Sequence, residues 1–214
     1  ADGADRAGDD VGPAPAPTAR VDLVDEVGQC LLGAAEELSQ RLGYRPRYHI
    51  LNTAGIERYP EYALDMARLG LGLYGISPTQ LPGTTPIARL STIILQLRSL
   101  PAGECVGYGC RGVTQHPARI AVIPIGYADG FSRRLSNGAY AASVHGVLCP
   151  TIGNVCMDAC MIDVTEVADP KAGDPVVIFG AEACPLEGMA EACDTIPYEI
   201  LTGLSLRIQR RYWR

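Results

Sequence analysis

The sequence predicts an α/β part followed by a β-rich part. Across residues 20–82 a helical pattern alternates with short apolar runs, the order found in the last units of a parallel α/β, TIM-like barrel. A Pro-, Gly- and Thr-rich break at residues 77–86 follows, and we place the domain boundary at Pro82. In residues 83–214 short β-branched runs separated by turn residues predict a barrel-like β domain, partly antiparallel.

The first part begins with a segment that we expect to be a flexible lead-in or long loop. Residues 1–19 are rich in Asp, Gly, Pro and Ala, and such a composition buries too little apolar surface to offset the entropy of ordering. From Val21 to Leu42, apolar side chains recur at three- and four-residue spacing, which predicts an amphipathic helix with Gly43 as its C-terminal cap. Apolar runs at residues 48–51 and 66–74 predict two strands.

The second part carries six short apolar runs that are typical of strands. They span residues 91–100, 118–125, 142–148, 160–164, 175–179 and 206–212. Two short helices are expected near the end, at residues 188–194 and 196–201. Thr195 is the expected N-cap of the second helix, with Pro197 in its first turn.

Composition narrows the classes of function. A net charge of −6 gives no basic footprint for nucleic acid. The sequence has no run of about 18 apolar residues and no recognisable signal peptide, so we expect a cytoplasmic protein without a membrane partner. The eight cysteines are then interpreted as reduced thiols. Cys156 and Cys160 lack a second ligand pair at zinc spacing, so we expect no metal site.

Two tyrosines lie beside glycines at the ends of apolar runs. Tyr108 stands between Gly107 and Gly109, which permit a sharp turn, and Tyr127 follows Gly126. Phenols ionise near pH 10, so a tyrosine in such a place is more often a surface or packing residue than a base. A catalytic role needs a neighbour that relays the proton, and His49, on the first predicted strand, is one candidate.

A second set of residues has the chemistry of a phosphate site. Asn52-Thr53 follow a predicted strand, where barrels build their sites, and Gly70-Leu71 offer backbone N–H groups. Arg68 lies in an apolar run, so it either forms an ion pair, with Asp65 or Glu61, or faces a cleft. From these residues alone the sequence predicts a two-domain protein with a candidate phosphate-binding cleft.

Six motifs in order carry a family resemblance. They are His49-x-x-Asn52-Thr53, Arg68-Leu69-Gly70-x-x-x-Tyr74, Gly107-Tyr108-Gly109, Pro124-x-Gly126-Tyr127-Ala128-Asp129-Gly130, Gly153-x-x-Cys156-Met157-Asp158 and Ile196-Pro197-Tyr198-Glu199. Together they resemble the C-terminal part of the pyridoxal-phosphate-dependent alanine racemases, over residues 21–214. The resemblance implies the last units of an eight-stranded α/β barrel and a complete β-rich C-terminal domain.

The resemblance also implies roles for individual residues. In this family, homodimers share their active sites, and the tyrosine at the position of Tyr108 enters the partner's barrel to remove the α-proton of L-alanine. His49 is expected to assist it from the barrel side. Met157, through its backbone, and Tyr127 are expected to contact substrate in the partner.

The cofactor contacts follow from the same resemblance. Thr53, Gly70, Leu71 and Tyr198 are expected to hold the phosphate of pyridoxal 5'-phosphate, and Arg68 to face its pyridine nitrogen. Because an arginine side chain stays protonated, it hydrogen-bonds to that nitrogen without handing over a proton. This weakens the electron sink and is expected to limit side reactions.

The chain departs from the family pattern because its first part contains no lysine. Schiff-base chemistry needs a lysine, and the only lysine here, Lys171, lies in a polar turn of the second part. Asn154 also stands where many members carry arginine. We therefore expect the parent gene to encode an enzyme that interconverts L- and D-alanine for peptidoglycan, and this chain alone to be inactive. The alternative is a non-catalytic dimerisation or binding module, or the remnant of a fused cell-wall ligase-racemase.

Overall fold

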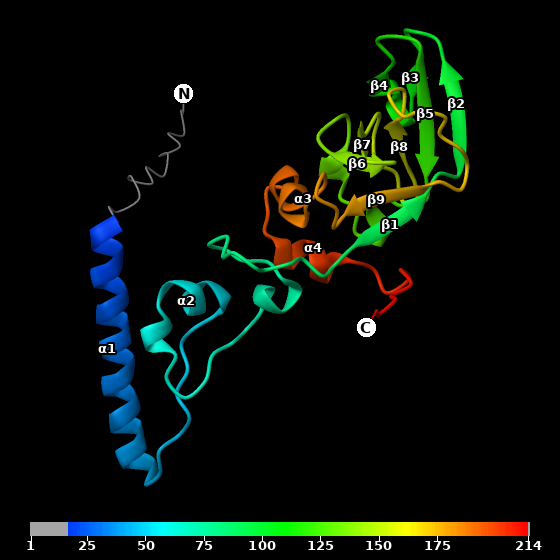
Figure 1. Ribbon diagram of the computed structural model, residues 1–214. Coiled ribbons are helices and arrows are strands. Elements are labelled where there is room, and N and C mark those ends of the chain that lie inside the picture. The colour runs from blue at the N-terminus through cyan, green and yellow to red at the C-terminus, as the bar shows by residue number, and fades with distance from the viewer. Residues whose placement is uncertain (1–16, 214) are drawn as a thin grey trace, which may run out of the picture. The chain divides into compact units, whose positions relative to one another are not determined.

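The computed structural model describes residues 17–213 and the side chains of residues 26–213. The chain divides into two compact units, whose relative placement is not determined (Figure 1). The first, which we call the helical unit, comprises Ala1–Gly70 and Ser77–Pro82. The second, the β unit, comprises Leu71–Ile76 and Gly83–Arg214.

The helical unit is dominated by α1 (Pro17–Leu42). The sequence predicted this helix, and it ends as predicted: Gly43 adopts φ 72° and its N–H donates to Ser39 O at 3.0 Å. It begins at Pro17 rather than Val21. Of the expected lead-in, residues 1–16 lie outside the described residues, and residues 17–19 belong to the helix.

The rest of the helical unit is short and irregular. It contains α2 (Thr53–Arg58) and the 3₁₀ turn η1 (Pro60–Tyr62). The two strands predicted at residues 48–51 and 66–74 are wrong, because neither segment forms a strand in the described chain. The first still lies beside residues 65–68, joined by two backbone bonds, from Asp65 N to Tyr48 O at 3.1 Å and from Arg68 N to Leu51 O at 2.9 Å. Two backbone hydrogen bonds without further ones beside them do not make a pair of β-strands.

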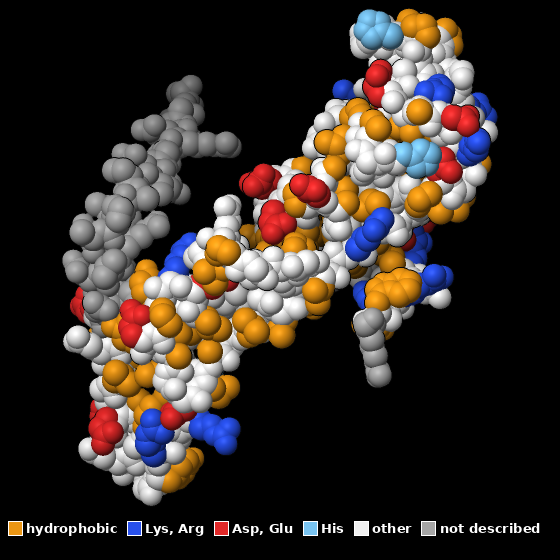
Figure 2. Space-filling view, viewed as in Figure 1, with side chains coloured by type: hydrophobic (Ala, Val, Ile, Leu, Met, Phe, Trp, Pro, Cys, Tyr) orange, Lys and Arg blue, Asp and Glu red, His pale blue; other side chains and the backbone are white. Residues whose placement is uncertain are grey.

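Burial is sparse in this unit. Ala35 and Leu51 are buried, whereas several large apolar side chains of α1 are exposed. Figure 2 shows apolar side chains at the surface of this part of the chain. The apolar stripe that predicted the helix is thus left largely in contact with solvent.

The β unit contains three antiparallel sheets (Figure 1). Its strands are β1 (Leu90–Ile93), β2 (Gln96–Leu100), β3 (Cys105–Val106), β4 (Gly112–Val113), β5 (Ala118–Ile123), β6 (Ala141–Val144), β7 (Val147–Pro150), β8 (Cys160–Asp163) and β9 (Pro175–Phe179). The sheet orders are β1-β9-β6-β7, β2-β5-β8 and β3-β4. The predicted β-rich domain is therefore confirmed as a fold class.

Two predicted runs are each divided by a change of direction. The run 91–100 splits into β1 and β2, which belong to different sheets: Ile94 N donates to Asp174 O at 2.9 Å and Leu95 N to Val122 O at 2.8 Å. The run 142–148 breaks at His145 and Gly146, whose φ values of 51° and 83° make the tight turn of the β6–β7 hairpin.

The C-terminal segment gave mixed results. Helices α3 (Leu186–Ala192) and α4 (Pro197–Gly203) confirm the two predicted helices. Thr195 was wrong as the N-cap, which is Ile196. The strand predicted at 206–212 is also wrong, because that described segment pairs with no strand and Leu206 is exposed.

The core of the β unit joins its two larger sheets to its helices. Its fully buried side chains include Phe131, Leu135, Ile162, Ile178 and Met189 of α3. Ile200 of α4 belongs to the same cluster, so the core fixes the helix that carries Tyr198. Across the described residues, no helix is both long and apolar enough to cross a membrane.

Candidate active site

Tyr108 projects from a turn of the β unit that only glycine can complete. It begins η3 (Tyr108–Cys110), which connects β3 to β4. Gly107 and Gly109 have φ values of 76° and 71°, in the left-handed region that favours glycine. A Cβ on Gly107 would also lie 2.7 Å from Met161 Cε. The phenol is 77% exposed, so the turn presents it to whatever approaches the unit.

Asn154 holds the backbone of this turn. Its Nδ2 donates to Tyr108 O at 3.3 Å, and its Oδ1 accepts from Asn137 Nδ2 at 3.2 Å. From the loop before β8, Asn154 is thus a bridge between the Tyr108 turn and the segment before β6. A sequence pattern gives no sign of this contact, because the three residues are far apart in the chain.

Tyr127 and Met157 are brought together by backbone hydrogen bonds. Tyr127 N donates to Cys156 O and Ala128 N to Met157 O, each at 3.0 Å, at the start of η4 (Tyr127–Asp129). A Cβ on Gly126 would lie 2.3 Å from either acceptor oxygen, so only glycine allows the approach. Both side chains are partly exposed, 44% for Tyr127 and 54% for Met157.

Arg207 connects the same two loops, and the sequence interpretation missed it. Its Nε donates to Asp129 Oδ1 at 2.6 Å and its Nη2 to Asp158 Oδ1 at 2.7 Å. Burial raises the pKa of Asp129, but hydrogen bonds from Arg207 and from Gly126 N outweigh it and hold that pKa below the ordinary value. Both aspartates were visible in the motifs, whereas their partner lies far along the chain.

Tyr198 contacts one of the predicted phosphate donors within the β unit. It lies in the first turn of α4, which Pro197 opens, and its hydroxyl accepts from Leu71 N at 2.8 Å. A phosphate oxygen could accept from the same backbone N–H and from the phenol, sharing or replacing this hydrogen bond.

The helical unit positions the other predicted phosphate contacts. Asn52 is the N-cap of α2, and its Oδ1 accepts from Gly55 N at 2.9 Å. Thr53 follows as the first helical residue and is buried. Its Oγ1 accepts from Gly70 N at 2.9 Å, so the structure brings Thr53 and Gly70 together.

Arg68 and His49 also belong to the helical unit. Arg68 is exposed, and its Nη2 donates to Ile50 O at 3.0 Å. The ion pair considered for it is not formed in the described chain, since Asp65 pairs with Arg45 at 2.9 Å. His49 has an exposed side chain.

Lys171 is held in an ion pair, and Cys160 is a buried thiol. Lys171 Nζ pairs with Asp169 at 2.9 Å in an exposed turn. Burial raises the pKa of the Cys160 thiol to about 12, which disfavours the thiolate that metals bind. In the part of the chain that the structure describes, no group of three or more His, Cys, Asp or Glu side chains could hold a metal ion.

The cysteines on either side of the Tyr108 turn correct one expectation. Cys105 and Cys110 form a disulfide, with their Cα atoms 4.9 Å apart. The prediction of reduced thiols throughout is wrong for this pair, because the left-handed residues of the turn, including Cys110 at φ 51°, fold the chain back on itself. The other six described cysteines are free.

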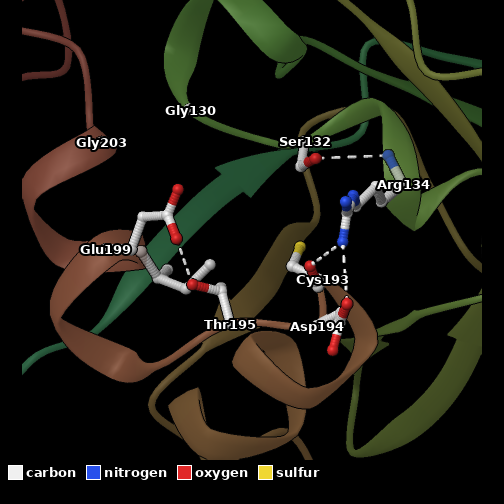
Figure 3. Close-up of a pocket in the computed structure, with 9 residues that line it drawn as sticks. Gly130, Ser132, Arg134, Cys193, Asp194, Thr195, Glu199 and Gly203 are labelled. Atoms are coloured by element: carbon white, nitrogen blue, oxygen red, sulfur yellow. Dashed lines mark hydrogen bonds and ion pairs between the residues drawn. The ribbon is translucent and has the colours of Figure 1, made fainter. Parts of the chain in front are cut away.

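A small pocket beside α4 is lined in part by Gly130 and Glu199 of the motifs, and its charged groups pair with other residues of its lining. It has a volume of about 290 Å³. Figure 3 shows Arg134 reaching Cys193 O, at 2.7 Å, and Asp194, while Thr195 hydrogen-bonds to Glu199. The charged side chains of this pocket are thus paired within its own lining.

Comparison with known proteins assigns the chain. The family model described as "Alanine racemase, C-terminal domain" matches residues 87–212, and that described as "Alanine racemase, N-terminal domain" matches residues 17–78. This chain belongs to the alanine racemase family. Its mixed α/β fold, with a helical unit and a β unit, is consistent with a segment of an alanine racemase.

Individual alanine racemases support the assignment. Alanine racemase 1 of Caldanaerobacter subterraneus subsp. tengcongensis is 41% identical over 175 residues, covering 78% of this chain and 45% of the relative. The alanine racemase of Sorangium cellulosum is 38% identical over 192 residues, covering 85% and 50%. This chain therefore spans about half the length of the curated relatives it matches.

Solved structures agree. The alanine racemase of D-cycloserine-producing Streptomyces lavendulae superimposes with a TM-score of 0.77 at 31% identity, covering 90% of this chain and 51% of that one. The Bartonella henselae alanine racemase, described with covalently bound pyridoxal phosphate, gives a TM-score of 0.74 at 33% identity, covering 82% and 50%.

Proposed function

We propose that this chain supplies part of the active site of an enzyme that interconverts L- and D-alanine with pyridoxal 5'-phosphate. The observation that carries the proposal is the exposed Tyr108, held on a glycine turn in a chain whose family is assigned. The matches to racemases give no support to the alternative of a non-catalytic binding module or remnant. We place the enzyme in the cytoplasm, where peptidoglycan precursors would use D-alanine.

The donor groups of this chain fit a cofactor phosphate. Gly70 N and Leu71 N belong to consecutive residues, and each already donates to a hydroxyl, that of Thr53 and that of Tyr198 respectively. Within each unit, the N–H group and the hydroxyl are donors of the kind that a phosphate dianion binds. Asn52 would keep the helix start in place through its cap.

Arg68 would act on the cofactor, whereas Tyr108 would act on the substrate. When bound, pyridoxal phosphate supplies an electron sink for negative charge at Cα of alanine. In the described chain Arg68 donates one N–H group to Ile50 O, so it has others to offer the pyridine nitrogen, and it keeps its proton. Tyr108 Oη would accept the proton from Cα of L-alanine and return it in the reverse direction.

The remaining contacts would come from the loops that Arg207 joins. Met157 through its backbone and Tyr127 through its side chain would contact the substrate. His49 of one copy would hydrogen-bond to Tyr108 of the other. We propose that Tyr108, Tyr127 and Met157 act in the active site of a second copy in a homodimer. The support is their common exposure on the β unit, since each is available to an approaching partner.

The amine that holds the cofactor is proposed to come from outside these 214 residues. Lys171 is the only lysine of the sequence, and it is exposed and paired with Asp169. The chain incubated with pyridoxal phosphate and L-alanine should therefore form no D-alanine by chiral chromatography. Turnover by the chain alone would contradict this.

A chimaera tests the catalytic role directly. Residues 83–214 replace the matching segment of the Caldanaerobacter racemase, and D-alanine formation is measured. We expect turnover, and Tyr108→Phe should lower it by roughly 100-fold or more, because general acid–base groups contribute that much. The matched control is Tyr212→Phe, the same change at a tyrosine that is 89% exposed. Equal rates for the two variants would remove Tyr108 from the mechanism.

A further inference from the structure

We propose that Cys105 and Cys110 are a reversible dithiol–disulfide pair that controls how firmly the Tyr108 turn is held. The two residues enclose the turn, one in β3 and the other at the end of η3. Their Cα atoms are 4.9 Å apart, inside the range that a disulfide spans without moving the backbone. The consequence for proton transfer rests on the proposed function, whereas the thiol chemistry does not.

The pair is the exposed cysteine site of the β unit in the described structure, since Cys156 is only partly exposed. Both residues are exposed in the described structure. Four of the other cysteines of this unit, Cys149, Cys160, Cys184 and Cys193, are buried. Burial raises the pKa of all four thiols, which lowers the fraction of reactive thiolate. A small thiol or disulfide from solution would therefore react at the Tyr108 turn first.

Few other contacts hold this turn in place. The β3–β4 hairpin has only two residue pairs, Cys105 with Val113 and Val106 with Gly112. At the base of the hairpin, Gly103 N also donates to Thr114 O at 2.7 Å and Thr114 N to Glu104 O at 3.0 Å. At the turn itself, the described side chains add one bond, from Asn154 Nδ2 to Tyr108 O at 3.3 Å, which is long. Closing the ring through two sulfur atoms removes conformations that this short hairpin would otherwise allow. The oxidised form should hold Tyr108 in one position, and the reduced form should let the turn open.

The oxidant in this thiol–disulfide exchange is a low-molecular-weight disulfide of the oxidised glutathione class. The thiolate of one cysteine attacks the small disulfide, breaking its S–S bond and releasing one small thiol. The second cysteine attacks the mixed disulfide, forms the bond between Cys105 and Cys110, and releases the second small thiol. The protein loses two electrons and two protons, and the small disulfide gains both.

The test uses the full 214-residue chain in buffers that range from reduced to oxidised glutathione. Differential alkylation with peptide mass spectrometry follows each thiol, and amide hydrogen exchange follows residues 105–113. We expect Cys105 and Cys110 to become protected together and to regain both thiols on reduction. Exchange in the turn should be about fivefold faster or more in the reduced form, because an open loop loses protection, while β5 is unchanged.

Two variants sharpen the comparison. Cys105→Ser with Cys110→Ser should exchange like the reduced chain in every buffer. Cys30→Ser, at an exposed cysteine of α1, should leave the turn's redox response intact. Thiols that stay alkylatable in oxidised buffer, or that each carry glutathione separately, would overturn the proposal, as would equal exchange in the two forms. These readouts need neither cofactor nor substrate, so they stand whatever the chimaera shows.

Discussion

In the β unit large apolar side chains are buried together, whereas in the helical unit many of those on α1 lie at the surface. Phe131, Ile162 and Met189 of the β unit are fully buried in one cluster. On α1, by contrast, Leu38 is 49% exposed, although it belongs to the stripe that predicted the helix. One unit thus carries its own hydrophobic stabilisation and the other carries little.

The same difference separates the two groups of candidate site residues. Tyr127 and Met157 sit on loops that are joined by backbone bonds, closed by Arg207 and anchored to the β unit's core. Arg68 and Thr53 sit on segments of the helical unit held by a few single bonds. The geometry of the β-unit residues is therefore set within that unit, while that of Arg68 and Thr53 has little local support.

Producing the two units as separate fragments should show the largest difference between them. A fragment of residues 71–214 contains every residue of the main core cluster and should unfold in one cooperative transition. A fragment of residues 1–70 should show no such transition, because its burial is too sparse. Urea denaturation followed by circular dichroism, with the dispersion of NMR signals, checks both. A cooperative transition in residues 1–70 would mean that the helical unit is more than a packed helix with loops.

The sequence predicted what local patterns determine. The α1 helix, the β5, β8 and β9 strands and the helices α3 and α4 all follow from apolar spacing, turn residues and caps. The predicted strands at 48–51 and 66–74 fail because a strand depends on neighbours for its hydrogen bonds, and apolar content alone does not provide them. Spacing within one run likewise gave no sign that β1 and β2 join different sheets.

The candidate site shows the same limit. Glycines around Tyr108 and Tyr127 marked both turns, because glycine is required there by φ or by close approach. Arg207, by contrast, is a long-range partner whose role appears only when folding brings it to Asp129 and Asp158. The disulfide was missed for another reason: the argument from cellular compartment spoke against it and weighed no local geometry.

Core substitutions measure the difference between the units at single residues. Ile162→Ala in β8 removes a side chain that is 0% exposed and should lower the free energy of unfolding by about 3 kcal/mol, through lost burial and a cavity. The control is Leu38→Ala in α1, which should cost less than about 0.5 kcal/mol, the range of surface changes. Urea unfolding of the full chain measures both. Equal costs would show that α1 is buried in solution.

The smallest expected effect concerns Arg207, whose charge joins the loops of Tyr127 and Met157. Asp129 has a pKa depressed below its ordinary value, so its contribution to stability is present above the unfolded pKa, near 4, and is lost as the pH falls through the folded pKa. Arg207→Met removes the hydrogen bond and the charge that depress it but keeps an apolar stem. We expect the Asp129 pKa to rise, as measured by the pH titration of its carboxyl ¹³C signal, and the acid sensitivity of unfolding to weaken.

The matched control is Arg210→Met, at a neighbouring arginine that donates to Leu204 O and forms no ion pair in the described chain. An Asp129 pKa that moves equally in both variants would show that Arg207 acts through general charge, not through the contact that holds the loops of Tyr127 and Met157 together.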